Sequence, residues 1–334
     1  MVMPNFRFGA AASASPPIVI APDNAAISTS DFVSVSVNSA RIRFTRGIVD
    51  GQGFENANPG ARVRFVTNAP ALTVHLQYTN LVSRPDTYNG VGTVLVNGAL
   101  ATTFDRVQGV AGPLSVPLTF GSIASRTVEV VMPYCASVDF LGVDLAAGSS
   151  ISQAAARPTT RYVAIGDSIT HGFNASAARL SWPFLLAQNK SWTLINTGYG
   201  SRQVNAADGT RVANLSPTVA TYLIGYNNFA AQTPLATFRT EYEAFLTNFR
   251  AINTVARLYC ITPTWTPNSF GALTIEQYRQ QIRDAVAASA NPMNVLVEGA
   301  SLATNSVTHF PDNVHPNDAG SAAMAAALSP IVVP

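Results

Sequence analysis

The chain has 334 residues, of which 47% are hydrophobic and only 11% are charged, and its formal net charge is +2. So much apolar sequence can bury a large core, which excludes intrinsic disorder, and the dispersed basic residues exclude a nucleic-acid partner or an anionic membrane surface. A surface solvated mainly by hydroxyl and amide groups is typical of an extracellular or carbohydrate-facing protein.

Residues 1–27 are predicted to form an N-terminal tail. Residues 1–17 contain one arginine and a run of small side chains, but no apolar stretch as long as a signal peptide needs. No apolar run in the chain reaches the roughly 18 residues of a membrane-spanning helix. We therefore expect no membrane partner. The composition favours a secreted or periplasmic protein, although no clear signal peptide is present.

Residues 28–147 are predicted to form an antiparallel β-sandwich. Apolar and polar side chains alternate there, which is the pattern of strands that bury one face. Turn residues separate these segments, and Asn97-Gly98 is typical of a two-residue hairpin. The clearest alternating segments are 32–37, 41–44, 62–66, 72–78 and 127–131.

Residues 148–160 are rich in glycine, serine and alanine and predict a linker. From 161 to 334, short apolar runs alternate with stretches of helical spacing, of which 235–249 is the clearest. A second helix is expected over 274–289, opened by a capping box of Thr274 and Gln277. This alternation predicts an α/β domain whose parallel sheet is covered by helices on both faces.

The candidate site lies where the parallel strands end, because ligands bind beyond the carboxyl edge of such sheets. The first apolar run is followed by Gly166, Asp167 and Ser168, which places a serine at a strand-to-helix turn. A helix N-terminus favours negative charge that develops on a nearby oxygen. Ser168 is therefore the candidate nucleophile.

A serine hydroxyl needs a base to take its proton, and the chain has four histidines. His315 follows Asp312 by three residues, so a turn can bring the carboxylate onto Nδ1 and leave Nε2 for Ser168. We expect His171 at the surface or on the pocket wall, and His75 as a cross-strand partner.

Acyl transfer also requires donors for the negatively charged oxygen of the intermediate. The N–H of Ser168, a backbone N–H near Gly200 and the side-chain amide of Asn227 all follow predicted strands. Aromatic rings at the same strand ends either line a sugar or acyl pocket or pack against the loops. These candidate pocket residues are Tyr199, Tyr226 and Trp265.

From about 161 to 328 the chain resembles the SGNH, or GDSL, hydrolase family of serine esterases and lipases. Four blocks match in order: Gly-Asp-Ser at 166–168, the Asn-to-glycine block at 196–200, Gly-x-Asn at 225–227 and Asp-x-x-His at 312–315. The resemblance implies a three-layer hydrolase domain that needs no cofactor. It implies a catalytic triad of Ser168, Asp312 and His315, with an oxyanion hole of Ser168, Gly200 and Asn227.

Two positions depart from the family pattern. Asn228 stands where an aspartate is usual, and because that acid is mainly structural we expect activity to survive. Ser201 stands where the second block usually has a glycine, so the second donor is the backbone N–H of either Gly200 or Ser201.

A β-sandwich ahead of such a hydrolase is similar to the two-domain carbohydrate acetylesterases related to carbohydrate esterase family 2, which carry a jelly-roll-like domain. That resemblance implies hydrolysis of short acyl esters, acetyl above all, on a small-molecule or polysaccharide substrate. A broad aryl or lipid esterase is one alternative. Another is a sugar-binding protein on a vestigial hydrolase fold. The oligomeric state is left open.

Two other kinds of chemistry fit part of the pattern. Asp312 and His315 can form half of a metal site, but the nearest third ligand is His309 and the two cysteines lie far apart. Asp167 and Asp312 would suit a glycosidase, yet the serine and histidine make acyl transfer the simpler account. We therefore expect no metal.

Overall fold

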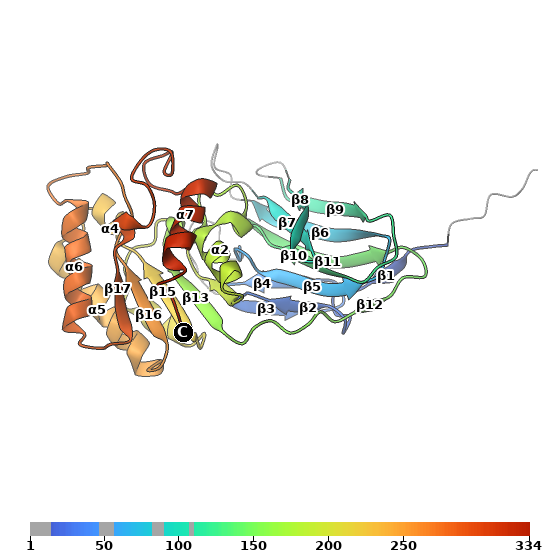
Figure 1. Cartoon of the computed structure of the whole chain (residues 1–334), viewed down its shortest axis with the longest axis horizontal. Coiled ribbons are helices and arrows are strands. Elements are labelled where there is room, and N and C mark those ends of the chain that lie inside the picture. The colour runs from blue at the N-terminus through green and yellow to red at the C-terminus, as the bar shows by residue number, and fades with distance from the viewer. Residues whose placement is uncertain (1–14, 47–56, 82–89, 107–109) are drawn as a thin grey trace, which may run out of the picture.

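The computed structural model describes residues 15–46, 57–81, 90–106 and 110–334. Strands of the first half of the chain form one body, and the second half forms a sheet covered by helices. The two bodies lie end to end along the long axis of the molecule (Figure 1). Within the described residues, no helix has both the length and the apolar composition needed to cross a bilayer.

The first body is a sandwich of two antiparallel sheets, as predicted. One sheet has the order β3 (Ser34–Val37), β4 (Ile42–Thr45), β11 (Ala136–Leu145), β6 (Ala71–Leu81) and β9 (Gly112–Thr119). The other has the order β12 (Ile151–Ser152), β5 (Arg62–Thr67), β10 (Arg126–Val131), β7 (Gly92–Val96) and β8 (Ala99–Phe104), while β2 (Ser28–Ser30) pairs with β5. From β4 to β11 the chain passes between the sheets in the manner of a jelly roll.

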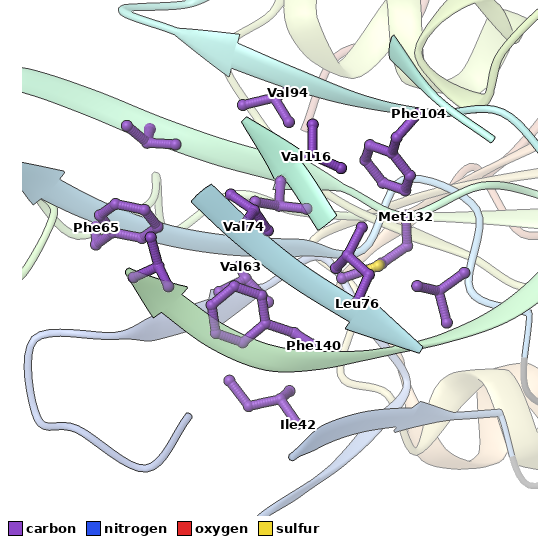
Figure 2. Packing of buried hydrophobic residues seen from close by; sticks show 14 of the residues in the cluster. Ile42, Val63, Phe65, Val74, Leu76, Val94, Phe104, Val116, Met132 and Phe140 are labelled. Carbon is purple, nitrogen blue, oxygen red and sulfur yellow. The ribbon is translucent and has the colours of Figure 1, made fainter. Parts of the chain in front are cut away.

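Alternating apolar side chains of the two sheets meet to form the sandwich core. In β6, Leu72, Val74 and Leu76 are buried, whereas the residues between them are partly exposed. Figure 2 shows Val74 and Leu76 in one packed cluster with Phe65 of the facing sheet and with Phe140 of the neighbouring strand β11. The predicted hairpin is also present: β7 pairs with β8 across Asn97 and Gly98, both with positive φ.

Two short strands lie in segments that the sequence predicted to be a tail and a linker. β1 (Ile18–Ile20) pairs with β11, and β12 pairs with β5. At three and two residues, both strands are too short to show an alternating pattern. Residues 1–14 of the predicted tail lie outside the described residues.

The second body is the predicted α/β domain. Its parallel sheet has the order β14 (Thr193–Asn196), β13 (Arg161–Gly166), β15 (Val219–Leu223), β16 (Arg257–Ile261) and β17 (Asn294–Val297). The core on one face includes α2 (Trp182–Asn189) and α7 (Asp318–Leu328), and that on the other face includes α3 (Ala207–Ala213), α5 (Leu235–Ile252) and α6 (Ile275–Ala288). Buried aromatic residues form the stripe predicted for α5, and α6 begins at the predicted capping box of Thr274 and Gln277.

The sandwich packs on the α2 side of the domain (Figure 1). Leu95 and Val131 lie on the outer face of the second sandwich sheet and join the same core cluster as Trp182. The guanidinium of Arg62 lies 4.6 Å from the ring centroid of Phe184 in α2. The two bodies therefore share a continuous packed interface.

Candidate active site

Ser168 lies at the start of the short helix α1 (Ser168–His171), directly after β13. The strand order reverses between β13 and β15, which is the switch point where open α/β sheets bind ligands. Asp167 caps the helix, since its carboxylate accepts a hydrogen bond of 3.0 Å from the N–H of Ile169. A Cβ at Gly166 would lie 2.3 Å from the carbonyl oxygen of Leu223, so this tight turn requires glycine.

The structure brings together the three residues that the sequence grouped. His315 Nε2 lies 2.7 Å from Ser168 Oγ, and His315 Nδ1 lies 2.6 Å from Asp312 Oδ2. Ser168 is separated from His315 by 147 positions in the sequence, and its side chain is 7% exposed. With the Nδ1–H donated to Asp312, the lone pair of Nε2 faces the serine hydroxyl.

A tight turn holds Asp312 on the imidazole. Its Oδ1 accepts hydrogen bonds from the N–H of Val314 at 3.0 Å and from the N–H of His315 at 2.7 Å. Burial raises the pKa of Asp312, but the hydrogen bond and charge of His315 and these two N–H groups outweigh it and lower the pKa to about 2. Asp312 is therefore a carboxylate near neutral pH.

The loop after β14 carries Gly200 and Ser201 to the same edge of the sheet. Gly200 is buried, and Ser201 has a φ of 59°, in the left-handed region that favours glycine. Arg202 fixes the base of this loop by donating to the carbonyl oxygens of Gly166 and Thr197 at 3.2 and 3.1 Å. Arg202 also donates to the carboxylate of Asp208 at 2.9 Å. Sequence reasoning missed Arg202, because no local pattern marks a buried arginine that also binds backbone carbonyls.

Asn227 lies in α4 (Tyr226–Ala230), after β15, and its Nδ2 donates to the carbonyl oxygen of Arg202 at 3.0 Å. An amide nitrogen has two hydrogens, so one bond fixes the side chain and the second hydrogen is available to a substrate oxygen. The next residue, Asn228, is buried and accepts a hydrogen bond from the N–H of Val204 at 3.0 Å. Asn228 thus supplies an acceptor to the loop, a structural contact of the kind expected at this position.

The three aromatic candidates are all partly exposed. Tyr226 Oη accepts a hydrogen bond of 2.9 Å from Asn268, and the Tyr199 ring lies 4.8 Å from the guanidinium of Arg202. The Trp265 ring lies 5.7 Å from that of Phe310, two residues before Asp312. Sequence reasoning missed Phe270, which is 46% exposed with its ring centroid 6.2 Å from that of Tyr226.

The prediction that His171 lies at the surface or on a pocket wall is wrong. Its side chain is fully buried, with its ring centroid 5.7 Å from that of Tyr134 in the sandwich. Burial, and then the positive charge of Arg46, hold the pKa of His171 well below its usual value. The imidazole is therefore neutral and belongs to the packing behind α1.

The other two histidines lie away from Ser168. His75 contacts Ser115 and Asp144 on the neighbouring strands β9 and β11, which confirms a cross-strand partner. His309 Nδ1 accepts a hydrogen bond from the N–H of Thr304 at 3.0 Å. Among the described residues, no three side chains of His, Cys, Asp or Glu gather as metal ligands.

Asp167 gives the stability of the protein a specific dependence on pH. Burial raises its pKa to about 6, and its Oδ2 has no hydrogen-bond partner among the described residues. Because the folded pKa lies above the unfolded value of 3.8, this group favours folding most below about pH 4 and loses that contribution as the pH rises through about 6.

As the pH rises from about 4 to about 7, the free energy of unfolding of the wild type is expected to fall by up to about 3 kcal/mol more than that of Asp167→Asn. Urea unfolding at several pH values measures the difference. Other titrating groups are the same in both proteins, so parallel stability curves for the two would contradict this assignment.

Comparisons with known proteins bear on the family and the fold of the chain. A family model described as the GDSL-like lipase/acylhydrolase family matches residues 164–323. No curated protein matches the chain in sequence. Among solved structures, the salicylyl-acyltransferase SsfX3 from a tetracycline biosynthetic pathway is similar, with a TM-score of 0.78 at 17% identity over 94% of this chain and 96% of that one.

Two carbohydrate esterases are also similar in fold. A family two carbohydrate esterase from Cellvibrio japonicus has a TM-score of 0.72 at 15% identity, over 94% of this chain and 96% of that one. The acetyl xylan esterase Est2A from the rumen bacterium Butyrivibrio proteoclasticus has a TM-score of 0.66 at 12% identity, over 95% and 98%. Residues 164–323 are therefore a domain of the GDSL-like lipase/acylhydrolase family, and the whole chain shares its two-domain fold with these solved structures.

Proposed function

We propose that the protein is a serine esterase that removes short acyl groups, acetyl above all, from a carbohydrate. The observation that carries this proposal is the hydrogen-bonded line from Ser168 through His315 to Asp312, with links of 2.7 and 2.6 Å. This is the arrangement that turns a serine hydroxyl into a nucleophile near neutral pH.

In the first half of the reaction, Ser168 Oγ attacks the ester carbonyl carbon while its proton moves to His315 Nε2. Asp312 stabilises the imidazolium that forms. When the tetrahedral intermediate collapses, the bond from carbon to the leaving oxygen breaks, and Nε2 gives its proton to that oxygen. The products are a free alcohol and an acyl group on Ser168.

Water completes the cycle by the same route. His315 takes a proton from the water as it attacks the acyl carbon, and returns that proton to Ser168 Oγ when the acid leaves. The negative oxygen of both intermediates is held by the N–H of Ser168, by a backbone N–H at Gly200 or Ser201, and by the Asn227 amide. The cycle uses only side chains, backbone and water.

Two observations support a carbohydrate as the acyl carrier. Both carbohydrate esterases described above cover nearly the whole of this chain, sandwich included, and one is an acetyl xylan esterase. The partly exposed rings of Tyr226 and Trp265, both near the Ser168 side of the sheet, present faces on which a sugar can stack. The surface, with 11% charged residues, also suits a neutral polysaccharide.

Activity on p-nitrophenyl esters of increasing chain length, compared with acetate release from acetylated xylan, tests this substrate class. We expect the acetyl ester to be the best of the series and xylan to be deacetylated. A preference for long acyl chains would favour a lipid esterase. Binding of xylan without turnover of any ester would favour a sugar-binding protein on a vestigial hydrolase fold.

Asn227→Ala is expected to lower kcat on p-nitrophenyl acetate by about 10²-fold, because an oxyanion donor acts mainly in the transition state. Asn248→Ala is a matched control, since Asn248 Nδ2 also donates to a backbone carbonyl, that of Ala206 at 2.9 Å, but from α5 rather than from the turn after β15. An unchanged kcat in the Asn227 variant would remove this side chain from the oxyanion hole.

A further inference from the structure

Arg46 connects the sandwich to the loop that follows β14. It comes directly after β4, is buried to 2% exposure, and its Nη1 lies 2.5 Å from the carbonyl oxygen of Gly198. The two residues are 152 positions apart. A charged donor on a neutral carbonyl makes one of the stronger hydrogen bonds in proteins, and burial removes the competition of water.

Gly198 lies directly against the helix that carries Ser168. A Cβ at Gly198 would lie 2.5 Å from the backbone nitrogen of His171 and 2.8 Å from the carbonyl carbon of Thr170. The peptide that accepts from Arg46 also donates, through the N–H of Tyr199, to the carbonyl oxygen of Gly166 at 3.3 Å. One peptide unit of the loop therefore joins the sandwich arginine to the turn that leads into Ser168.

We infer that Arg46 is a positioning residue for the esterase reaction, and that the sandwich helps to build the oxyanion hole. By holding the carbonyl of Gly198, Arg46 sets how far the N–H groups at Gly200 and Ser201 lie from the N–H of Ser168. These donors must converge on one oxygen. A misplacement of about 1 Å in such a site costs about 10²-fold in rate. This inference rests on the proposed function.

A second contact from the sandwich reaches the other side of the site. The Tyr134 ring, just after β10, has its centroid 6.1 Å from that of Phe173, and the Phe173 centroid lies 5.1 Å from that of His315. Tyr134, Cys135 and Phe173 share one small buried cluster formed by both bodies. The sandwich therefore contacts Phe173, which packs on the imidazole of His315, as well as the loop at 196–201.

Arg157 provides a matched control. It also donates to a backbone carbonyl at one end of β14, that of Trp192 at 2.8 Å, but at the opposite end of the strand from Gly198. Its loss removes a comparable contact between guanidinium and carbonyl, together with an ion pair to Asp31 at 3.3 Å, without touching the loop at 196–201. A general loosening of the protein affects both arginine variants, whereas loss of positioning affects only the Arg46 variant.

The experiment compares Arg46→Met and Arg157→Met with wild type on p-nitrophenyl acetate, below the melting temperature of each. Arg46→Met is expected to lower kcat by about 10²-fold with little change in KM, and to slow labelling of Ser168 by a fluorophosphonate. Arg157→Met is expected to keep the kcat and labelling rate of wild type.

A wild-type kcat and labelling rate in Arg46→Met would overturn the inference, and so would an equal loss in both variants. If Arg46→Met does not fold, Arg46→Gln decides by the same criteria, since it keeps a polar end but is too short to hold Gly198. Full activity of Ser168→Ala would instead refute the proposed function. An inactive Ser168→Ala beside a normal Arg46→Met would refute only the role of Arg46.

Discussion

Ser168→Ala is expected to lower kcat on p-nitrophenyl acetate by about 10⁴-fold or more, the largest effect of any single substitution in the site. Without Oγ no acyl-enzyme can form, and only the oxyanion donors and substrate binding remain to accelerate attack by water. The fold should be unaffected, because the side chain of Ser168 caps no helix and its hydroxyl hydrogen-bonds to the imidazole of His315.

Two measurements make this test specific. A fluorophosphonate is expected to label Ser168 of the wild type, as mapped by mass spectrometry. This labelling is expected to be lost in Ser168→Ala. Ser181→Ala is the matched control, since Ser181 is also buried but donates to the carbonyl oxygen of Ala178 at 2.8 Å rather than to a base. Labelling of another serine, or equal loss of activity in both variants, would be inconsistent with Ser168 as the nucleophile.

Most of the fold could be predicted from the sequence because its strands and helices repeat over enough residues to show a period. β6, with 11 residues, alternates over its described side chains, and α5, with 18, has a continuous buried stripe. β1 and β12 could not be predicted in this way. Their assignment depends on pairing with β11 and β5, which no local pattern reports.

The candidate site was predictable for a different reason. In a parallel sheet every strand end reaches the same edge, so Ser168, Asn227 and His315 could be grouped from their positions after strands and before helices. The surroundings of these residues could not. His171 is polar and close to Ser168 in sequence, yet it is buried against Tyr134, which comes from the other body.

The interface between the two bodies is the part of the structure that the sequence predicted least well. Arg46 and Asp31 are charged residues near predicted strands, and charged residues there are usually solvated. Their burial depends on partners in the other half of the chain, Gly198 and Leu194 respectively. Such pairs become visible only once the two bodies are placed against each other.

Asp31→Ala is expected to lower the free energy of unfolding by about 3–5 kcal/mol, because it removes one partner from a buried group of charges. The Asp31 side chain is fully buried and lies 3.4 Å from Arg62 and 3.3 Å from Arg157. It also accepts a hydrogen bond of 2.7 Å from the N–H of Leu194 in β14, the edge strand of the parallel sheet. The variant removes one partner from each guanidinium group and from this N–H, and the Arg62 side chain is only 6% exposed.

Urea unfolding followed by both fluorescence and circular dichroism measures this loss and shows whether the two bodies still unfold together. Glu276→Gln is the control: its side chain is 58% exposed and pairs with Arg283 at 2.6 Å, so its removal is expected to cost less than about 1 kcal/mol. We expect the wild type to unfold in one transition, and since Asp31 bonds both the sandwich and the edge strand, we expect Asp31→Ala to unfold in two. A change in Asp31→Ala as small as that in Glu276→Gln would mean that the charges at the interface are solvated, and that other contacts hold the sandwich against the hydrolase domain.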